Sequence, residues 1–238
     1  FKGQKWFPTT KGGKFRKWYG NFEFVLLWEE DGKDIKNFKF PNGKLRSVIR
    51  NKDYYYKSGL TWTGVSNSKI SIRFVPEGFI FNAAGPTIFT NDENGIIASM
   101  NSKLIDSVSK FISPTLNFEV GQIQKYPILK SSNRNRNIAQ SCIDISKKDW
   151  DSFETSWDFK TSPLLAMKGN SKSLQTTYNC LRMEWQKWTD EMLNLEEENN
   201  QIFIDAYDLN DELEKNVSLQ DITLSRNPAY RYGIKISR

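Results

Sequence analysis

Apolar and polar residues alternate along the first third of the chain, and this alternation predicts β-strands. Residues 22–28 carry apolar side chains at every second position, which places them on one face of a strand that ends in the acidic turn before Gly32. A shorter strand with alternating basic and aromatic residues is predicted at 14–19, and another begins at Trp62. The first 90 residues are therefore expected to form a mainly antiparallel β unit.

The clearest hairpin pattern in the sequence covers residues 69–82. Its first strand runs to Val75, the turn follows at Pro76-Glu77-Gly78, and the alternation then resumes at Phe79. The predicted inward residues of the first strand are Ile70, Ile72 and Phe74, and the predicted outward ones are Lys69, Ser71 and Arg73.

Beyond the β unit the apolar spacing changes from two to three and four residues, which is typical of helices. One helix is predicted at about 92–112, with Asn91 or Asp92 as its N-cap. A second helix is predicted to begin near Asn133, and residues 158–171 follow it as a loop.

The most regular pattern lies near the C-terminus, where apolar residues from Leu174 to Leu209 are separated by four and three residues in strict alternation. Such a 3.5-residue repeat predicts a supercoil against a partner helix, and its lone polar member, Asn199, would fix the register. Two partners are open: the helix that begins near Asn133, which would give an antiparallel helical hairpin, and a second polypeptide. The alternative is an ordinary amphipathic helix that lies on the β unit.

These elements predict an α+β chain in two parts. Residues 1–130 form the β-rich unit, with the helix at about 92–112 included, and residues 131–238 form a helical support with a C-terminal tail. The stretch from Leu116 to Gly121 is expected to be a strand, and the residues up to Pro127 to complete a rigid joint between the two parts. Replacement of Gly121 or Pro127 is therefore expected to disturb docking.

Charge is distributed unevenly along the chain. Residues 1–75 hold 16 Lys and Arg against 6 Asp and Glu, a net charge of +10, whereas residues 76–130 hold 4 against 5 and residues 131–238 hold 14 against 17. A basic first third with a neutral to acidic remainder is typical of a surface that binds a polyanion such as DNA. A generally basic soluble surface is the alternative.

The candidate DNA contacts are basic residues and one tyrosine in the predicted β unit. Arginine can bind guanine with two hydrogen bonds, lysine neutralises phosphate, and tyrosine can stack on a displaced base. The basic residues at 14–17 could instead protect an exposed strand edge, and the tyrosines at 54–56 could be half core. The candidates are Lys14, Arg16, Lys17, Lys44, Arg46, Arg50, Lys52, Tyr54, Lys69 and Arg73.

Composition also excludes several kinds of chemistry. The chain has no histidine, which removes hydrolase triads, histidine-containing zinc sites and the commonest general base. Neither a glycine-rich phosphate-binding fingerprint nor a C-x-x-C pair is present, and the acidic run Glu196-Glu197-Glu198 is expected to be a solvated helix face. The tetrapeptide Asn227-Pro228-Ala229-Tyr230 differs from the N-P-P-Y motif of adenine methyltransferases and is interpreted as a chance resemblance.

A soluble, cytoplasmic protein is expected from three features of the sequence. The chain has two cysteines, it has no apolar run long enough to span a membrane, and it does not start like a signal peptide. Because Phe1 already lies in patterned sequence, the chain is expected to be a fragment of a larger protein.

Six motifs, four of which contain tryptophan, occur in a fixed order along the chain: Trp18-Tyr19-Gly20-Asn21, Trp28-Glu29-Glu30-Asp31-Gly32, Gly59-Leu60-Thr61-Trp62-Thr63, Pro76-Glu77-Gly78-Phe79-Ile80-Phe81, the stretch from Asn117 to Ile123 and the stretch from Ile143 to Phe159. In this order they resemble the C-terminal region of the PglX family, the adenine-specific DNA methyltransferases of BREX phage-resistance systems. The resemblance covers nearly the whole chain.

The resemblance implies that the chain is the target-recognition region of an adenine-N6 methyltransferase whose catalytic domain precedes Phe1. The parent enzyme would bind S-adenosylmethionine and flip an adenine out of duplex DNA, while no catalytic, cofactor or metal residue can be assigned in this chain. The implied partners are double-stranded DNA, the catalytic domain of the same polypeptide and other defence proteins, and no membrane is implied. Two alternatives remain: a scaffold that uses the heptad helix, and a DNA-mimicking docking surface on the acidic helices.

Overall fold

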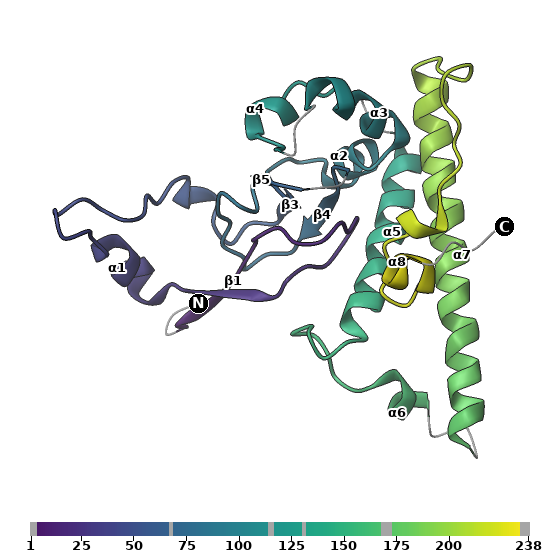
Figure 1. Cartoon of the computed structure of the whole chain (residues 1–238), viewed down its shortest axis with the longest axis horizontal. Helices are drawn as coiled ribbons and strands as arrows, with labels where there is room; N and C mark the ends of the chain where they lie inside the picture. Colours follow the sequence, from purple (N-terminus) through teal and green to yellow (C-terminus); the bar gives the residue numbers. More distant parts are fainter. Residues whose placement is uncertain (1–3, 67–68, 114–116, 130–131, 168–172, 234–238) are drawn as a thin grey trace.

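The structure, a computed structural model, describes residues 4–66, 69–113, 117–129, 132–167 and 173–233. A β-rich part projects sideways from two long helices that run antiparallel to each other (Figure 1). The long helices are α5 (Asn133–Asp151) and α7 (Leu174–Ala206), and they pack against one another as the predicted helical hairpin. The predicted α+β class is confirmed.

The β-rich part contains two small antiparallel sheets. In the first sheet, β1 (Trp6–Thr9) pairs with β2 (Phe24–Leu27), which confirms the strand predicted at 22–28. In the second, β3 (Gly59–Trp62) lies between β4 (Ile72–Val75) and β5 (Thr87–Ile88).

The hairpin predicted at 69–82 is wrong. Strand β4 pairs with β3 on one edge, and on its other edge the backbone of Trp18 exchanges hydrogen bonds with Ile72 and Phe74. After the turn the chain leaves this sheet and reaches β1, where the N–H of Ile80 donates to the carbonyl of Pro8 at 2.9 Å. Because β4 is covered on both faces, Ser71 and Arg73 are buried rather than outward.

The helix predicted at about 92–112 is two helices, α2 (Glu93–Met100) and α3 (Lys103–Ile112). Asp92 caps α2 as predicted, because its side chain accepts a hydrogen bond from the N–H of Gly95 at 3.0 Å. The break follows from Ser102, which has extended backbone and caps α3 with its own side chain. The region predicted as a loop at 158–171 contains the short helix α6 (Pro163–Met167).

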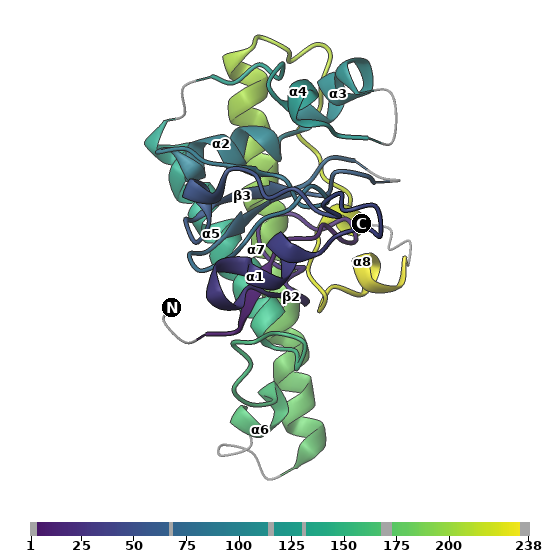
Figure 2. The same cartoon turned by 90° about the vertical axis from the view of Figure 1, so that its left-hand side faces the viewer.

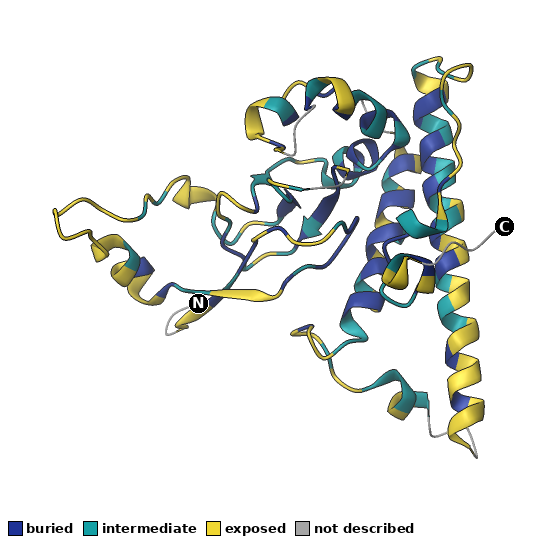
Figure 3. Ribbon diagram, in the orientation of Figure 1, coloured by how far each residue is buried: buried dark blue, intermediate teal, exposed yellow. Residues whose placement is uncertain are grey.

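The heptad residues of α7 are buried to different extents. Met192 and Asn199 in the upper half are buried, whereas the lower half is mostly exposed (Figure 3): Leu174 and Tyr178 are exposed there and Leu181 is buried. The amide of Asn199 donates to the carbonyl of Ala98 in α2 at 2.9 Å, so this residue fixes α7 against the β-rich part. None of the helices in the described ranges combines the length and the hydropathy that a bilayer span requires.

One cluster of buried residues extends through both parts of the chain. It contains Trp18 and Leu60 of the β-rich part together with Cys142 of α5, Met192 of α7 and Ile222 of the C-terminal tail. A small second cluster consists of Phe7, Trp28 and Ile80. The described part of the tail contains α8 (Pro228–Tyr232), which lies against the hairpin (Figure 1).

The predicted joint has a different structure from the one expected. Residues 114–116 lie outside the described residues, and the strand predicted up to Gly121 is replaced by the short helix α4 (Val120–Ile123), which has a capping box formed by Glu119 and Gln122. Among the described residues of this predicted strand, Asn117 keeps a strand-like bridge, to Val65. Gly121 is exposed, and a Cβ added to it would have no atom within 4 Å. The expectation that replacing Gly121 disturbs docking therefore has no steric basis.

We expect Gly121→Ala to raise the free energy of unfolding by about 0.5 kcal/mol, because alanine loses less backbone entropy than glycine in a helix. Thermal unfolding followed by circular dichroism measures the change. The matched control is Gly20→Ala: Gly20 has a φ of 119°, and a Cβ there would lie 2.5 Å from Nε of Arg16. Destabilisation by both substitutions would contradict the environment described for Gly121.

The two cysteines are expected to react very differently with a thiol reagent. Cys142 is completely buried, and this burial raises the pKa of its thiol well above the usual value, whereas Cys180 is exposed on α7. Brief treatment of the folded protein with iodoacetamide should therefore modify Cys180 alone, and Cys142 should react only after denaturation. Peptide mass spectrometry measures this, and equal labelling of the two residues would contradict the core assignment.

Candidate nucleic-acid interface

Residues 29–52, named the arm here, form the most exposed extension of the β-rich part (Figures 1 and 2). The arm contains α1 (Glu29–Asn37) and the loop that follows it up to Lys52. It starts at the end of β2 and returns toward the second sheet through the tyrosines at 54–56.

The chain enters the arm through three consecutive residues in the left-handed region, with φ of 47° at Glu30, 62° at Asp31 and 76° at Gly32. Left-handed backbone is unfavourable for residues other than glycine, so the turn requires support from its surroundings. A Cβ at Gly32 would lie 2.6 Å from the ring of Trp28, so the close approach of this ring requires glycine.

The two ends of the arm are joined by the carboxylate of Asp31. It accepts a hydrogen bond from Lys36 at 2.6 Å and another from Lys52, at the point where the arm returns. These two hydrogen bonds hold the pKa of Asp31 below its usual value. Asn51, next to Lys52, is also left-handed, with a φ of 53°.

The tip of the arm is a narrow two-stranded ribbon. Lys39 bridges Leu45 across the turn that contains Gly43, and the N–H of Phe40 donates to the carbonyl of Lys44 at 2.8 Å. At the base of the ribbon the N–H of Arg46 donates to the carbonyl of Phe38 at 2.9 Å.

Two aromatic rings orient Arg46 on this ribbon. Its guanidinium carbon lies 4.8 Å from the ring centroid of Phe38 and 4.7 Å from that of Phe40. Stacking on rings restricts the side chain while leaving the N–H groups at the guanidinium edge available for hydrogen bonds. Arg46 is thus a partly preorganised hydrogen-bond donor on an exposed ribbon.

Charge on the arm has one sign from Lys36 to Lys52. This stretch carries six lysines and arginines, all exposed, and no acidic residue. Within the described part of the chain, no hydrogen bond or ion pair involves the side chains of Lys39, Lys44, Arg46 or Arg50. Their charge is therefore available to an anionic ligand.

Behind the arm lies an apolar cavity of about 980 Å³. Trp28, Tyr55 and Phe81 line it from the β-rich part, and Val48 and Arg50 line it from the arm. Phe38 and Val48 are more than half exposed, so the arm has an apolar surface as well as a basic one.

Of the ten residues predicted to contact DNA, the structure places four on the arm: Lys44, Arg46, Arg50 and Lys52. Tyr54 follows directly, where its ring packs on Phe89 at a centroid distance of 4.8 Å. Lys14 is exposed in a separate loop. Lys69 is also exposed, but its ammonium lies between the carboxylates of Asp221 at 2.9 Å and Asp106 at 3.3 Å. Partial burial lowers the pKa of Lys69, but these two contacts outweigh it and raise the pKa above its usual value.

Three of the predicted contacts, Arg16, Lys17 and Arg73, are buried. Arg16 donates from Nη2 to Oδ2 of Asp149 in α5 at 2.9 Å and from Nη1 to Oγ of Ser225 in the tail at 2.9 Å. Arg73 donates to the carbonyl of Arg16 at 3.2 Å, and burial together with the charge of Arg16 lowers its pKa to about 10. These side chains bind other parts of the protein and are not available at its surface.

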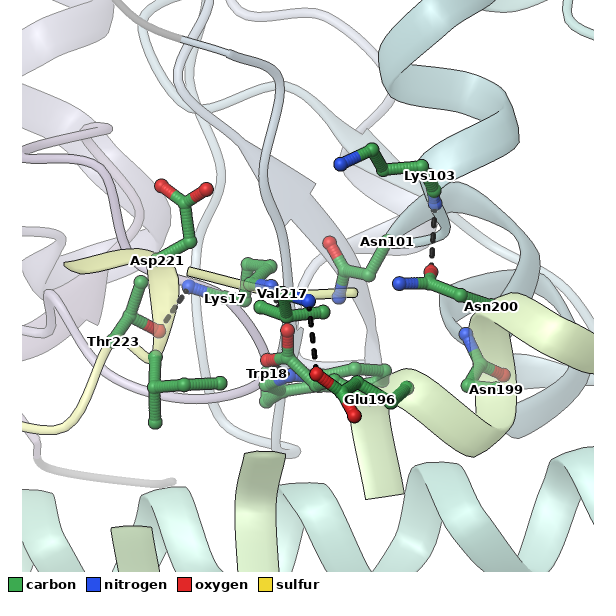
Figure 4. Close-up of polar contacts among 12 residues, drawn as sticks. Lys17, Trp18, Asn101, Lys103, Glu196, Asn199, Asn200, Val217, Asp221 and Thr223 are labelled. Atoms are coloured by element: carbon green, nitrogen blue, oxygen red, sulfur yellow. Dashed lines mark hydrogen bonds and ion pairs between the residues drawn. The ribbon is translucent and has the colours of Figure 1, made fainter. Parts of the chain in front are cut away.

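Lys17 belongs to the same buried polar interface, shown in Figure 4. Its ammonium pairs with Glu196 of α7, and the other carboxylate oxygen of Glu196 accepts from Nε1 of Trp18 at 2.8 Å. The prediction that Glu196 is solvated is therefore wrong. Asn200, one residue past Asn199, accepts from the N–H of Lys103 at 2.8 Å and so connects α7 to α3.

The loop at 14–19 therefore joins the β-rich part to the hairpin. Its backbone also takes part, because the N–H of Lys17 donates to Oγ1 of Thr223 in the tail at 3.0 Å. Three tertiary partners, α5, α7 and the tail, fix this loop. Together with the hydrogen bonds from α7 to α2 and α3, it therefore sets the orientation of the β-rich part on the hairpin.

Sequence reasoning missed Lys39 and the two phenylalanines that stack on Arg46. A signal was present, since Phe38 and Phe40 alternate with Lys39 in a stretch without acidic residues.

Among the residues described, no group of three or more cysteines and carboxylates is placed to hold a metal ion. Asn227 of the N-P-A-Y tetrapeptide caps α8 by accepting from the N–H of Ala229 at 3.1 Å.

Comparison with known proteins gives two close similarities, although no family model matches the chain. The chain is 39% identical over 234 residues to the adenine-specific methyltransferase BrxX of Escherichia coli O9:H4 (strain HS). The matched region covers 96% of this chain and 18% of that protein. It is 36% identical over 234 residues to the adenine-specific methyltransferase PglX of Lacticaseibacillus casei (strain Zhang). This matched region covers 94% of this chain and 19% of that protein. The chain thus spans about a fifth of the length of these relatives.

Proposed function

Because the chain is a relative of the PglX and BrxX adenine-specific methyltransferases along nearly its whole length, we propose that it recognises the DNA sequence at which such an enzyme acts. The observation that carries this proposal is the arm, which has six exposed basic residues and no acidic residue from Lys36 to Lys52 and ends in an exposed ribbon. The relatives' names support a role connected with adenine methylation.

The shape of the arm suits the major groove of DNA. That groove admits a two-stranded β-ribbon, and an arginine that enters it can bind O6 and N7 of guanine with two hydrogen bonds. Arg46 is the best placed residue for this contact, because Phe38 and Phe40 restrict its side chain before DNA binds. Lys39 and Lys44, on the two sides of the tip, would contact phosphates and position the ribbon.

The buried loop at 14–19 supplies the rigid support that sequence reading needs. A recognition element must hold its orientation, since a small displacement loses the directional hydrogen bonds to base edges. Arg16 and Lys17 serve the proposed function by fixing the β-rich part on the hairpin, through Asp149 and Glu196, rather than by touching DNA.

The chemical step is proposed to occur elsewhere in the protein. The relatives are about five times as long as this chain, and S-adenosylmethionine and the flipped adenine would be bound outside it. In this proposal the chain belongs to a BREX-type phage-defence enzyme, with duplex DNA and the catalytic domain of the same polypeptide as its partners.

A second candidate function is that of a protein-docking scaffold. The observation that favours it is the lower half of α7, where the apolar residues Leu174, Tyr178 and Met183 are exposed. Leu174 and Tyr178 continue the heptad pattern into this exposed part, which would suit a partner helix. The basic arm has no role in this alternative.

A salt titration of duplex binding by the full-length protein tests the proposal. Affinity should fall steeply between low and physiological salt, because each phosphate contact releases counterions. Undetectable or salt-insensitive binding of duplexes would contradict DNA recognition and favour the scaffold. A preference for one duplex sequence over unrelated duplexes is expected at physiological salt.

A further inference from the structure

A cavity of about 650 Å³ lies where the C-terminal tail packs against α7, at a place that the proposed DNA contact does not use. Its lining contains three arginines and three aromatic residues, but no aspartate or glutamate. These residues are Arg182, Arg226, Arg231, Tyr178, Trp185 and Tyr232.

The tetrapeptide Asn227-Pro228-Ala229-Tyr230 fixes two of these arginines in place. The Asn227 amide donates to the carbonyls of Leu219 at 2.7 Å and Ile222 at 2.8 Å, and the hydroxyl of Tyr230 donates to the carbonyl of Phe15. Arg226 and Arg231 flank this fastened segment. The tetrapeptide thus has a structural role that positions positive charge.

Arg226 forms the inner wall of the cavity. Its guanidinium carbon lies 3.9 Å from the ring centroid of Phe153 and 4.4 Å from that of Trp185. It donates from Nε and Nη2 to the hydroxyl and carbonyl of Ser152, at 3.1 and 3.0 Å. Burial lowers the pKa of Arg226; the charge of Asp149 opposes this effect, and the charge of Arg231 adds to it.

The other two arginines lack a counter-charge. Over the described ranges, no hydrogen bond or ion pair involves the guanidinium of Arg182 or Arg231. The carboxylate of Asp149 interacts with Arg226, but it already accepts from Arg16, from the N–H of Ser225 and from the N–H of Arg226. Converging like charges in a concave site are unfavourable without an anion.

The aromatic residues narrow the class of anion. Tyr232 and Tyr178 are exposed at the cavity, and the Arg231 guanidinium carbon lies 5.5 Å from the ring centroid of Tyr232. Arginine binds phosphate through parallel hydrogen bonds, and exposed aromatic rings provide faces for a flat base. A ligand that carries both a phosphate and a base satisfies both features.

We propose that this cavity binds a nucleotide, with its phosphate on Arg182 and Arg231 and its base against Tyr232 or Tyr178. The nucleotide is either free in solution or part of a nucleic-acid strand, since the two sources present the same chemistry. The proposal does not depend on the arm or on sequence recognition.

Calorimetric titration of the full-length protein with inorganic phosphate, adenosine monophosphate and a short single-stranded oligonucleotide tests this proposal. The double substitution Arg182→Gln/Arg231→Gln should weaken binding of the nucleotide ligands at least about tenfold. Tyr232→Ala should weaken nucleotide binding at least about fivefold and leave phosphate binding unchanged. Lys187→Gln, an exposed cation on α7 that does not line the cavity, is the matched control and should have no effect.

Tight binding of adenosine monophosphate identifies the free nucleotide as the source, and binding of the oligonucleotide alone identifies a nucleic-acid strand. The proposal is overturned if the double variant binds both nucleotide ligands as well as the unsubstituted protein does. It is also overturned if neither nucleotide ligand binds better than inorganic phosphate. Circular dichroism melting confirms folding of each variant, and the single variant Arg231→Gln replaces the double variant if that one unfolds.

Discussion

Replacing Asp149 with alanine is expected to lower the free energy of unfolding by about 3–5 kcal/mol, because it leaves a buried arginine without its counter-charge. The Asp149 side chain is fully buried and accepts from Nη2 of Arg16 at 2.9 Å. It also accepts from the N–H groups of Ser225 at 2.7 Å and Arg226 at 2.9 Å, so the substitution removes partners from both the β-rich part and the tail.

Chemical denaturation followed by tryptophan fluorescence measures this effect. The control is Lys33→Ala, which breaks an exposed ion pair with Glu30 and should leave the denaturation midpoint nearly unchanged. A loss below about 1 kcal/mol for the Asp149 variant would show that the buried ion pair does not join the β-rich part to the hairpin.

The triple substitution Lys44→Gln/Arg46→Gln/Arg50→Gln is expected to weaken duplex binding by about a hundredfold or more at physiological salt. Three contacts at roughly 1 kcal/mol each give this factor, and specific base contacts would increase it. Stability should change little, because all three side chains are exposed and form no ion pair with the described residues. Fluorescence anisotropy with labelled duplex measures the affinity and its salt slope.

The matched control replaces three exposed lysines away from the arm, with the variant Lys110→Gln/Lys160→Gln/Lys187→Gln. It makes the same change in net charge and should reduce affinity far less. Equal loss in the two triple variants would mean that DNA responds to overall charge, and the arm would then have no special role.

Local periodicity predicted the type and approximate position of strand β2, helix α5 and helix α7. The apolar residues Ile138, Cys142 and Ile145 of α5 are also its buried residues, whereas Phe24 of β2 and Leu174 of α7 are exposed although they belong to the apolar patterns. The caps at Asp92 and Ser102 show the limit of this method. Only the first was predicted, since an apolar pattern that continues across Ser102 conceals the break.

Long-range ion pairs were not predictable from pattern. Arg16 and Lys17 alternate with aromatic residues as an exposed basic strand would, yet their partners Asp149 and Glu196 lie more than a hundred residues away. Three consecutive helical residues point in different directions, so an acidic run such as 196–198 can place one carboxylate in the core and leave others outside. Composition therefore located the basic residues in the first third of the chain but overestimated how many of them belong to an exposed basic surface.

Four candidate contacts, Lys44, Arg46, Arg50 and Lys52, were predicted from the sequence, whereas the arm that carries them required the structure. The left-handed turn at Glu30 and Asp31 and the stacking of Arg46 on Phe38 depend on backbone conformation that a strand or helix pattern does not specify. The arginine-lined cavity was missed because Arg182 and Arg231 lie far apart in the sequence.

The proposal that the arm reads DNA sequence is tested most directly by mapping methylated adenines in cells that carry the full-length protein with Arg46→Ala. The expected result is a methylation motif that has lost its preference at one or two positions, with methylation still present. An unchanged motif at an unchanged level of methylation would contradict the proposed role of Arg46 and of the arm.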